Sequence, residues 1–542
     1  MRSSFRNLVQ TLRSYANQFD PESYQVKLNC FTNLKAIQLV AGKDLIPYYE
    51  TLLFILAYPD DEQLVVLAES ELARITKLLK THRKHKTSLY ENSGMPFTDI
   101  VTRFSHDKVR WLLEHPDGTV SLQSFEDPAH HLNDVLRLTL PSLEKSETTA
   151  ALSNMDLLDA LKVPVRNRLL FLIRELDRFD HLPLLKDHLF DRLDVFVRLT
   201  SRNKTISKAY NRLPGFQQHF HSDLVKRFEP RPILDNPLPA PALLDVSLKN
   251  EMIRVVKNSL VITSRETDPT TYMDENSFRL FHLERGISVA IYGMIPSRQL
   301  PLESYVGFTA FKNGFPASYG GAWIFGERSN FGINIFETFR NGESGYIMAQ
   351  LLRVYRHVFK INYYEVEPYQ FGLDNPEGIE SGAFWFYYRF GFRPLDAQLL
   401  QLAKKEYEKI TTRKGYRTNH ATLVKFTESS IGLKLGKNIP PKMTSIILRV
   451  TQMIQRDYEG DRKKAEDRCR ENFLKKAGLK LFLNEDENQV LTEVALWAEA
   501  MKIRDAKRLA LMEKMIITKP VDVDEYQKVL IRFFTASSSL KK

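Results

Sequence analysis

The sequence has almost no cysteine and no long apolar run. Its two cysteines, Cys30 and Cys469, lie outside any Cys-x-x-Cys or Cys/His cluster, which excludes a disulfide framework and a structural zinc site. No window approaches the roughly 18 consecutive apolar residues of a membrane-spanning helix. The first ten residues also lack the apolar stretch of a secretory signal. We therefore expect a cytoplasmic protein without a membrane partner and without a bound metal.

Several widespread catalytic motifs are also missing. The sequence has no Gly-x-x-x-x-Gly-Lys-Ser/Thr loop for phosphates, no His-Glu-x-x-His zinc helix, no Gly-x-Ser-x-Gly nucleophile elbow and no Gly-x-Gly-x-x-Gly dinucleotide turn. Its histidine pairs have no acidic neighbours in a metal-ligand pattern, so we expect them on the surface. These pairs are His82/His85, His130/His131 and His219/His221.

Positive charge is abundant, and it is confined to one end of the chain. The net charge is +11, and residues 401–542 contain 30 Lys and Arg against 19 Asp and Glu. These residues therefore hold the whole surplus, and residues 1–400 are neutral. A basic surface is typical of proteins that bind polyanions such as nucleic acid. If the protein has a polyanionic partner, we expect it to bind residues 401–542.

The length of 542 residues predicts more than one domain, and the composition suggests where they divide. Residues 1–229 show helical apolar stripes, such as Val165, Leu169, Leu172 and Leu176, and another that runs from Leu189 to Val197. These stripes predict an all-helical N-terminal domain. Residues 230–246 contain five prolines, which neither a helix nor a central strand would accept, and so predict a linker.

Residues 247–394 are richer in glycine and aromatic side chains, with 14 of the 23 glycines of the chain. We predict helices at 270–284, 344–359 and 376–390, the last one capped by Gly391, and a hairpin turn at Asn313-Gly314. Short β-rich runs predict strands at 259–263, 287–292, 305–311, 319–325, 331–336 and 361–367. Residues 395–542 return to helical patterns and predict a basic, all-helical C-terminal region.

The segment Phe339–Tyr346 connects a predicted strand to a predicted helix. Its glycines allow a tight turn, and the free N–H groups at a helix start favour an anion. Arg340 adds a positive charge suited to phosphate. An ordinary structural turn is the alternative. The candidate residues for binding a phosphorylated cofactor are Phe339, Arg340, Gly342, Ser344, Gly345 and Tyr346.

The end of the glycine-rich segment 247–394 resembles the GNAT (N-acetyltransferase) superfamily. Ala383-x-x-x-Tyr387-x-x-x-Gly391-Phe392 is similar to the closing motif of that family, and Lys312–Gly320 resembles the hairpin between its second and third strands. Arg340 and Gly345 match its acyl-coenzyme A turn, in which Glu343 replaces the central glycine. The resemblance covers residues 258–394. It implies an α+β or α/β fold in which a GNAT-like mixed sheet is flanked by the two helical regions, although the family usually has a final pair of strands where helix is predicted after Pro394.

The resemblance also implies roles for individual residues. The co-substrate would be acetyl-CoA or another acyl-CoA, gripped by the turn at Phe339–Tyr346. A carboxylate at a strand end, Glu337 or Glu367, would accept the proton of the amine, and Tyr387 would protonate the leaving thiolate. Two polar loops would form the walls of the substrate cleft between the splayed fourth and fifth strands, through Glu266, Tyr369, Gln370 and Asn375.

Two functions are compatible with these patterns. The first is an acyltransferase of GNAT type that moves an acyl group from a coenzyme A thioester, or from an aminoacyl-tRNA, to an amine. Because the flanking regions outweigh the core, the acceptor could be a protein or a tRNA-borne group. The second is a non-catalytic binding or scaffold protein that keeps the GNAT-like core and recognises its partner through the helical arms. Glu343 in the phosphate turn favours the second function.

Overall fold

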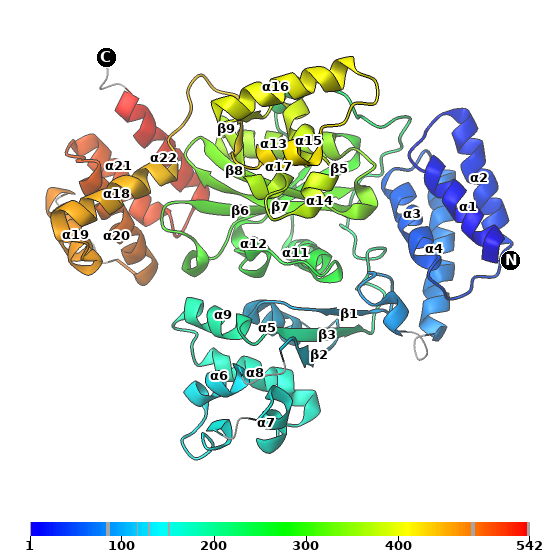
Figure 1. Ribbon diagram of the computed structural model, residues 1–542, viewed down its shortest axis with the longest axis horizontal. Helices are drawn as coiled ribbons and strands as arrows, with labels where there is room; N and C mark the ends of the chain where they lie inside the picture. The colour runs from blue at the N-terminus through cyan, green and yellow to red at the C-terminus, as the bar shows by residue number, and fades with distance from the viewer. Residues whose placement is uncertain are drawn as a thin grey trace.

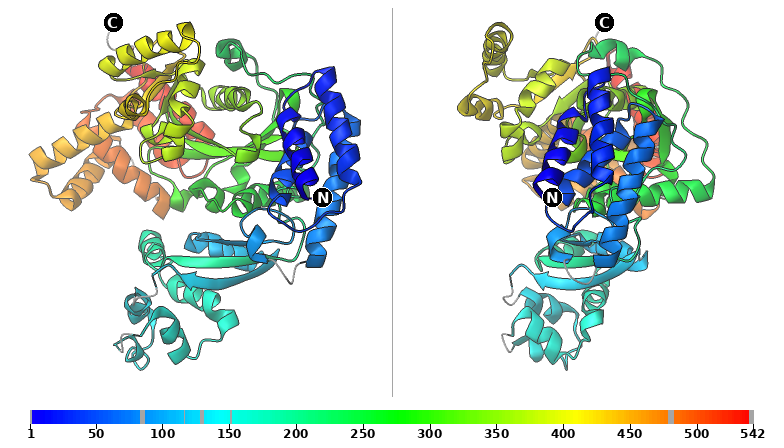
Figure 2. Two further views of the ribbon diagram at one scale, coloured as in Figure 1. Left: turned by 45° about the vertical axis from the view of Figure 1, so that its right-hand side comes forward. Right: turned by 90° about the vertical axis from the view of Figure 1, so that its right-hand side faces the viewer.

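The computed structural model describes residues 2–82, 87–115, 117–127, 131–149, 152–477 and 483–538. It has a mixed α/β fold built around an eight-stranded mixed sheet (Figure 1). Helices α1–α4 pack at one end of this sheet and α18–α22 at the other, while a small α/β unit lies below it in Figure 1. Two further views show the same three parts around the sheet (Figure 2).

The N-terminal helices share one apolar core with the central sheet. Helix α3 is buried on nearly every side because its sequence, Leu-Ile-Pro-Tyr-Tyr-Glu-Thr-Leu-Leu-Phe-Ile-Leu-Ala, is apolar all round. Its neighbours are amphipathic or partly polar and face solvent on one side. The four helices are α1 (Arg2–Tyr15), α2 (Pro21–Lys35), α3 (Leu45–Ala57) and α4 (Glu62–His82).

The prediction that residues 1–229 are all-helical is wrong. A three-stranded antiparallel sheet, in the order β1-β3-β2, lies among the helices of the small unit. Its central strand alternates buried and half-buried residues, which is the period of two of a strand. The first residues of this strand also fit the helical spacing from Leu189 to Val197, so the sequence predicted a helix. The elements are β1 (Asp99–Thr102), α5 (His106–Glu114), β2 (Gly118–Phe125), α6 (His131–Thr139), α7 (Asn154–Ala160), α8 (Arg168–Asp177), α9 (Pro183–Asp191) and β3 (Val195–Ser201).

Three further predictions fail between residues 230 and 284. The proline-rich segment contains a short helix, α10 (Pro230–Asp235), because prolines are tolerated in a first helical turn. The apolar run 259–263 ends helix α11 (Val246–Ile262), whose last turns are buried on all sides and therefore look like a buried strand in the sequence. The helix predicted at 270–284 is reduced to α12 (Asp268–Thr271), which is followed by strand β4 (Arg279–His282).

The central sheet has the order β10-β11-β9-β8-β7-β6-β5-β4. All neighbouring strands of this sheet pair antiparallel except β8 and β9, which are parallel. Helix α13 (Ser344–Phe359) joins these two strands and has the predicted bounds. The hairpin turn at Asn313-Gly314 is confirmed, with φ angles of 45° and 80°. The other strands are β5 (Ile287–Tyr292), β6 (Ser304–Lys312), β7 (Phe315–Phe325), β8 (Arg328–Ile335), β9 (Tyr363–Val366), β10 (Arg393–Pro394) and β11 (Ile431–Lys434).

The chain leaves the sheet after β9 and returns twice. Helices α14 (Pro376–Glu380) and α15 (Ala383–Phe390) replace the single helix predicted at 376–390, because Gly382 adopts φ 64° between them. Gly391 caps α15 with φ 116°, as predicted. After β10, helices α16 (Ala397–Thr412) and α17 (His420–Phe426) lead back to β11, which pairs between β10 and β9. The C-terminal region is therefore not all-helical.

The last helices form a second apolar core around Trp497 and Phe533. They contact the sheet through Gln527, which donates to the carbonyls of Gly326 and Phe359, and through an Arg279–Asp524 ion pair of 2.6 Å. Residues 478–482 and 539–542 of the basic region lie outside the described residues. No helix in the described ranges combines the length and apolarity needed to cross a membrane. These helices are α18 (Met443–Tyr458), α19 (Arg462–Ala477), α20 (Glu485–Ala500), α21 (Ala506–Thr518) and α22 (Val523–Ser538).

Candidate functional site

The parallel ladder between β8 and β9 is short, because β9 ends while β8 continues. The ladder has three residue pairs and ends at Asn330 and Glu365. β8 then continues for five residues, to Ile335, while β9 ends at Val366. The polar loop after β9 contacts this extension of β8: the side-chain oxygen of Gln370 accepts a hydrogen bond of 3.3 Å from the N–H of Ile333. The exposed edge of β8 is thus the starting point of the candidate site.

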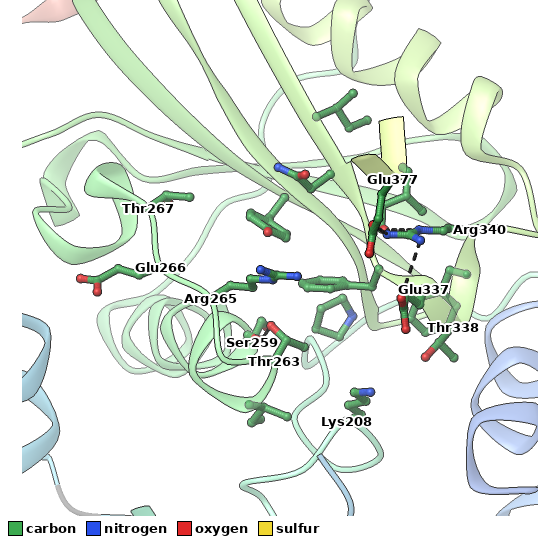
Figure 3. Close-up of a pocket in the computed structure, with 18 of the residues that line it drawn as sticks. Lys208, Ser259, Thr263, Arg265, Glu266, Thr267, Glu337, Thr338, Arg340 and Glu377 are labelled. Atoms are coloured by element: carbon green, nitrogen blue, oxygen red, sulfur yellow. Dashed lines mark hydrogen bonds and ion pairs between the residues drawn. The ribbon is translucent and has the colours of Figure 1, made fainter. Parts of the chain in front are cut away.

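A cavity of about 770 Å³ lies at the end of β8 (Figure 3). Its walls come from the loop after α11, from the β8–α13 connection, from the loop before α14 and from three residues of the N-terminal region. Because these segments are far apart in the sequence, only the fold brings them together. The predicted site residues in this cavity are Glu266, Glu337, Phe339, Arg340, Tyr369, Gln370 and Asn375.

The charged groups of this cavity differ in how firmly they are held. Arg340 forms ion pairs with Glu377 at 3.2 Å and with Glu337 at 3.7 Å, and Lys208 pairs with a glutamate outside the cavity. Arg265 is exposed, has no ion pair among the described residues and extends into the cavity from the loop after α11 (Figure 3). Arg265 is therefore the cation most available to a ligand.

Glu266 has a structural role in the geometry observed. Its carboxylate accepts hydrogen bonds from the N–H of Ser105 at 2.8 Å, from the Ser105 hydroxyl at 2.6 Å and from the Thr271 hydroxyl. These bonds connect the small α/β unit to the central sheet. Glu266 lines the cavity, but most of its acceptor capacity is used within the protein.

Tyr319 was not among the predicted site residues, yet its side chain lines the cavity. It lies on β7 opposite Asn334, and the residue is 8% exposed. Its hydroxyl has no hydrogen-bond partner among the described residues. Burial raises the pKa of Tyr319, while the charges of Arg265 and Arg340 counteract the rise. The alternation of strand residues predicts which face of β7 Tyr319 lies on, but no local pattern in the glycine-rich sequence around it indicates a cavity.

A smaller cavity of about 170 Å³ adjoins the larger one. Thr267, Asn334 and Gln370 line both cavities, which therefore lie side by side and are together called the cleft. Glu367, one of the two predicted bases, lines only the smaller cavity and accepts a hydrogen bond from the side-chain amide of Asn330. Glu337, the other, lines only the larger cavity. The structure therefore does not bring the two carboxylates together.

Tyr387 does not line either cavity. It lies on α15 with 3% exposure, its ring contacts Phe371, Phe386 and Phe392, and its hydroxyl has no hydrogen bond among the described residues. Burial raises the pKa of Tyr387 far above its ordinary value. An aromatic cluster thus encloses the tyrosine that the resemblance implies as proton donor.

The start of α13 is covered by the N-terminal part of the chain. A Cβ added to Gly342 would clash with the ring and the hydroxyl oxygen of Tyr58, and this hydroxyl accepts a hydrogen bond of 3.3 Å from the N–H of Glu343. Phe228 contacts the ring of Tyr346 and lies 3.5 Å from the Cβ position of Gly345. The predicted phosphate-binding residues Gly342, Ser344, Gly345 and Tyr346 line neither cavity.

Glu343 itself is fully buried in an ionic cluster. Its carboxylate lies 2.7 Å from Nζ of Lys312 and 2.8 Å from Nε of Arg285, and accepts a hydrogen bond of 2.9 Å from the N–H of Val225. The carboxylate therefore points away from the cleft and anchors the segment before α10.

His221 lies beside this cluster, which corrects the expectation of a surface histidine. It is 3% exposed, and neither ring nitrogen has a hydrogen-bond partner among the described residues. Burial, together with the positive charges of Lys312 and Arg285, lowers its pKa to about 2, so the ring is neutral. His85 and His130 lie outside the described residues.

Within the described residues, no group of three or more His, Cys, Asp or Glu side chains is placed to hold a metal ion. Comparison of the chain with protein-family models, with curated proteins and with solved structures gives no match.

Proposed function

We propose that the chain is an N-acyltransferase of GNAT type that joins an acyl donor to an amine acceptor in the cleft formed by the two cavities. The observation that carries the proposal is the polar cleft beside the part of β8 that continues beyond the β8–β9 ladder, which ends at Asn330 and Glu365. The β6–β7 hairpin, the helix-linked parallel strand β9 and the final strands β10 and β11 agree with the family resemblance and support it.

The reaction requires two proton transfers. The amine nitrogen attacks the carbonyl carbon of a thioester or aminoacyl ester, an N–C bond forms, and the C–S or C–O bond breaks. The amine loses its proton to a carboxylate, for which Glu367 in the smaller cavity and Glu337 in the larger one are the candidates. The leaving sulfur or oxygen takes a proton from Tyr319, which lines the larger cavity and whose hydroxyl has no hydrogen-bond partner among the described residues. Tyr319 thus replaces the enclosed Tyr387 in our mechanism.

In our proposal the acyl donor is bound by cations of the larger cavity and not by the turn before α13. Tyr58 occupies the space beside Gly342 and accepts a hydrogen bond from the N–H of Glu343, so this N–H is not free to bind a pyrophosphate. The cations that line the larger cavity, Lys208, Arg265 and Arg340, are the groups available to the phosphates of an acyl-CoA or an aminoacyl-tRNA. Arg265 contributes most because it has no internal ion pair.

The test is a transfer assay with labelled acetyl-CoA, a longer acyl-CoA and aminoacyl-tRNA as donors, and glucosamine, spermidine and a lysine peptide as acceptors. We expect transfer from one donor class, and a fall in kcat of roughly 100-fold or more for Tyr319→Phe and for substitution of the catalytic carboxylate by Gln. Tyr387→Phe is the matched control and should keep its kcat. Absence of both binding and transfer with every donor would overturn the proposal.

A second candidate is a non-catalytic binding protein. Two observations favour it: the start of α13 is covered, and Tyr387 is buried. The resemblance implies that the turn binds the acyl donor and that Tyr387 gives up a proton, and both groups are shielded here. Calorimetry separates the two functions. Donor or acceptor binding that depends on Arg265 or Glu367, without any transfer, would assign the cleft to recognition alone.

A further inference from the structure

The smaller cavity lies over a row of glycines on one face of the central sheet. Gly307, Gly321 and Gly332 are in register on the neighbouring strands β6, β7 and β8. The adjacent Phe308 and Phe331 contact Tyr355 of α13, so the glycines face the opposite side of the sheet. Without side chains in this row, neighbouring side chains come close to the backbone: Pro269 lies over Gly307, the Tyr305 ring over Gly321 and the Gln370 amide over Gly332. Gly321 and Gly332 line the cavity.

An aromatic wall borders this row. The half-buried Trp323 lies between Tyr305 and Asn330 in the next row of the sheet. Tyr305 stacks on one face of the indole, with ring centroids 4.4 Å apart and an interplanar angle of 15°. Trp323 and Tyr305 both line the smaller cavity, as does Asn330 on β8. The cavity thus has one flat apolar wall.

The facing wall is polar and rich in hydrogen-bond acceptors. The side-chain amide of Asn330 donates to Glu367, which leaves the Asn330 carbonyl oxygen for a ligand. The second oxygen of the Glu367 carboxylate has no hydrogen-bond partner among the described residues. Gln370 uses its oxygen for the N–H of Ile333 and keeps its NH₂ group. A ligand that fits this wall carries several donors, and preferably a positive charge near Glu367.

We propose that the smaller cavity binds an amino sugar, which is the amine acceptor if the proposed acyl transfer is correct. The apolar C–H face of a pyranose ring fits the indole of Trp323, its hydroxyls fit the amides of Asn330 and Gln370, and its ammonium group fits Glu367. A volume of about 170 Å³ suits one such ring. The Glu367 carboxylate disfavours a phosphate, and a nucleobase is uncharged at neutral pH and so lacks the positive charge that suits Glu367.

The experiment measures binding to the full-length protein without any donor, by saturation-transfer NMR and calorimetry with glucosamine, glucose, adenosine and cadaverine. We expect glucosamine to bind with a millimolar Kd and Trp323→Leu to weaken it roughly tenfold or more. Trp111→Leu removes a half-buried tryptophan outside the cleft and should change nothing. The exposed Glu367→Gln tests the charge: it should weaken glucosamine and leave glucose unchanged.

Three outcomes overturn the inference: no sugar binds at millimolar concentration, adenosine or cadaverine binds in preference, or Trp323→Leu binds glucosamine like the wild type while remaining folded by circular dichroism. The result is separable from the transfer assay. Sugar binding without transfer supports this site and counts against catalysis. Transfer to spermidine or a peptide without sugar binding does the reverse.

Discussion

His221 shows how burial, together with neighbouring positive charges, changes the chemistry of a residue. The folded protein keeps this ring neutral beside Lys312 and Arg285, whereas the unfolded chain binds a proton below its ordinary pKa of 6.5. Since the unfolded state then takes up more protons, the free energy of unfolding falls as the pH falls from 7 to 5. We expect His221 to contribute about 2 kcal/mol to this loss.

Urea unfolding at pH 7 and pH 5 measures this contribution. His221→Phe keeps an aromatic ring without the titratable group, so its free energy of unfolding should depend less on pH by that amount. His115→Phe provides the control, because His115 is exposed. Equal pH dependence in wild type and His221→Phe would contradict the argument.

At the scale of elements, the contact between the end of α3 and the start of α13 is set by steric fit. Gly342 has no positive φ angle, so glycine is needed there for space, beside Tyr58. Gly342→Ala should lower the free energy of unfolding by about 1 to 3 kcal/mol. Much of this penalty should vanish in a Tyr58→Ala background, since the clashing ring is absent, and a double-mutant cycle in urea measures that coupling.

Gly345, three residues after Gly342 and in the first turn of α13, supplies a matched control. The nearest atom to an added Cβ there is 3.5 Å away, on Phe228, which is an ordinary contact distance. Gly345→Ala should therefore leave stability within about 0.5 kcal/mol of the wild type or raise it, because alanine suits a helix better than glycine. Additive effects of Gly342→Ala and Tyr58→Ala would show that the two elements are not coupled through this contact.

The elements that the sequence predicts well are those with a local signal. Asn313-Gly314 needs positive φ angles, Ser344–Phe359 has an unbroken helical stripe, and Gly391 ends a helix in the left-handed region. The failures have no such signal. Val195–Ser201 pairs with strands about 70 to 100 residues away, and Ile431–Lys434 is a four-residue strand inserted between two others. Their pairing depends on tertiary structure, which overrides local patterns.

The same distinction explains the candidate site in the whole molecule. Loop residues such as Arg340 and Gln370 were predicted because they follow strands, and the fold gathers them at the end of β8. The cover over the turn was not predictable. Tyr58 lies 285 residues before Glu343, and no pattern in α3 indicates what its last turn touches. Likewise, the spacing of the motif indicates Tyr387 as a site residue, whereas its burial depends on contacts with Phe371 and Phe392.

Lys519 attaches the C-terminal helices to the central sheet. Lys519 is 1% exposed, and its Nζ lies 2.5 Å from Oε1 of Gln299 and 3.1 Å from Oγ of Ser304. Burial lowers its pKa from 10.5 to about 7. Because the unfolded lysine keeps its proton up to about pH 10, raising the pH from 7 to 9 should stabilise the folded protein, with about 2 kcal/mol from this residue.

Thermal and urea unfolding at pH 7 and pH 9 test this sign. Lys108 and Lys312 are also buried with lowered pKa values and act in the same direction, so the comparison must be between variants. Lys519→Met should lose about 2 kcal/mol of the rise, whereas Lys528→Met, which removes an exposed lysine from α22, should keep it. If Lys519→Met gains as much stability between pH 7 and pH 9 as the wild type, Lys519 is charged in the folded protein and the C-terminal helices are held to the sheet by an ion, not by a neutral amine.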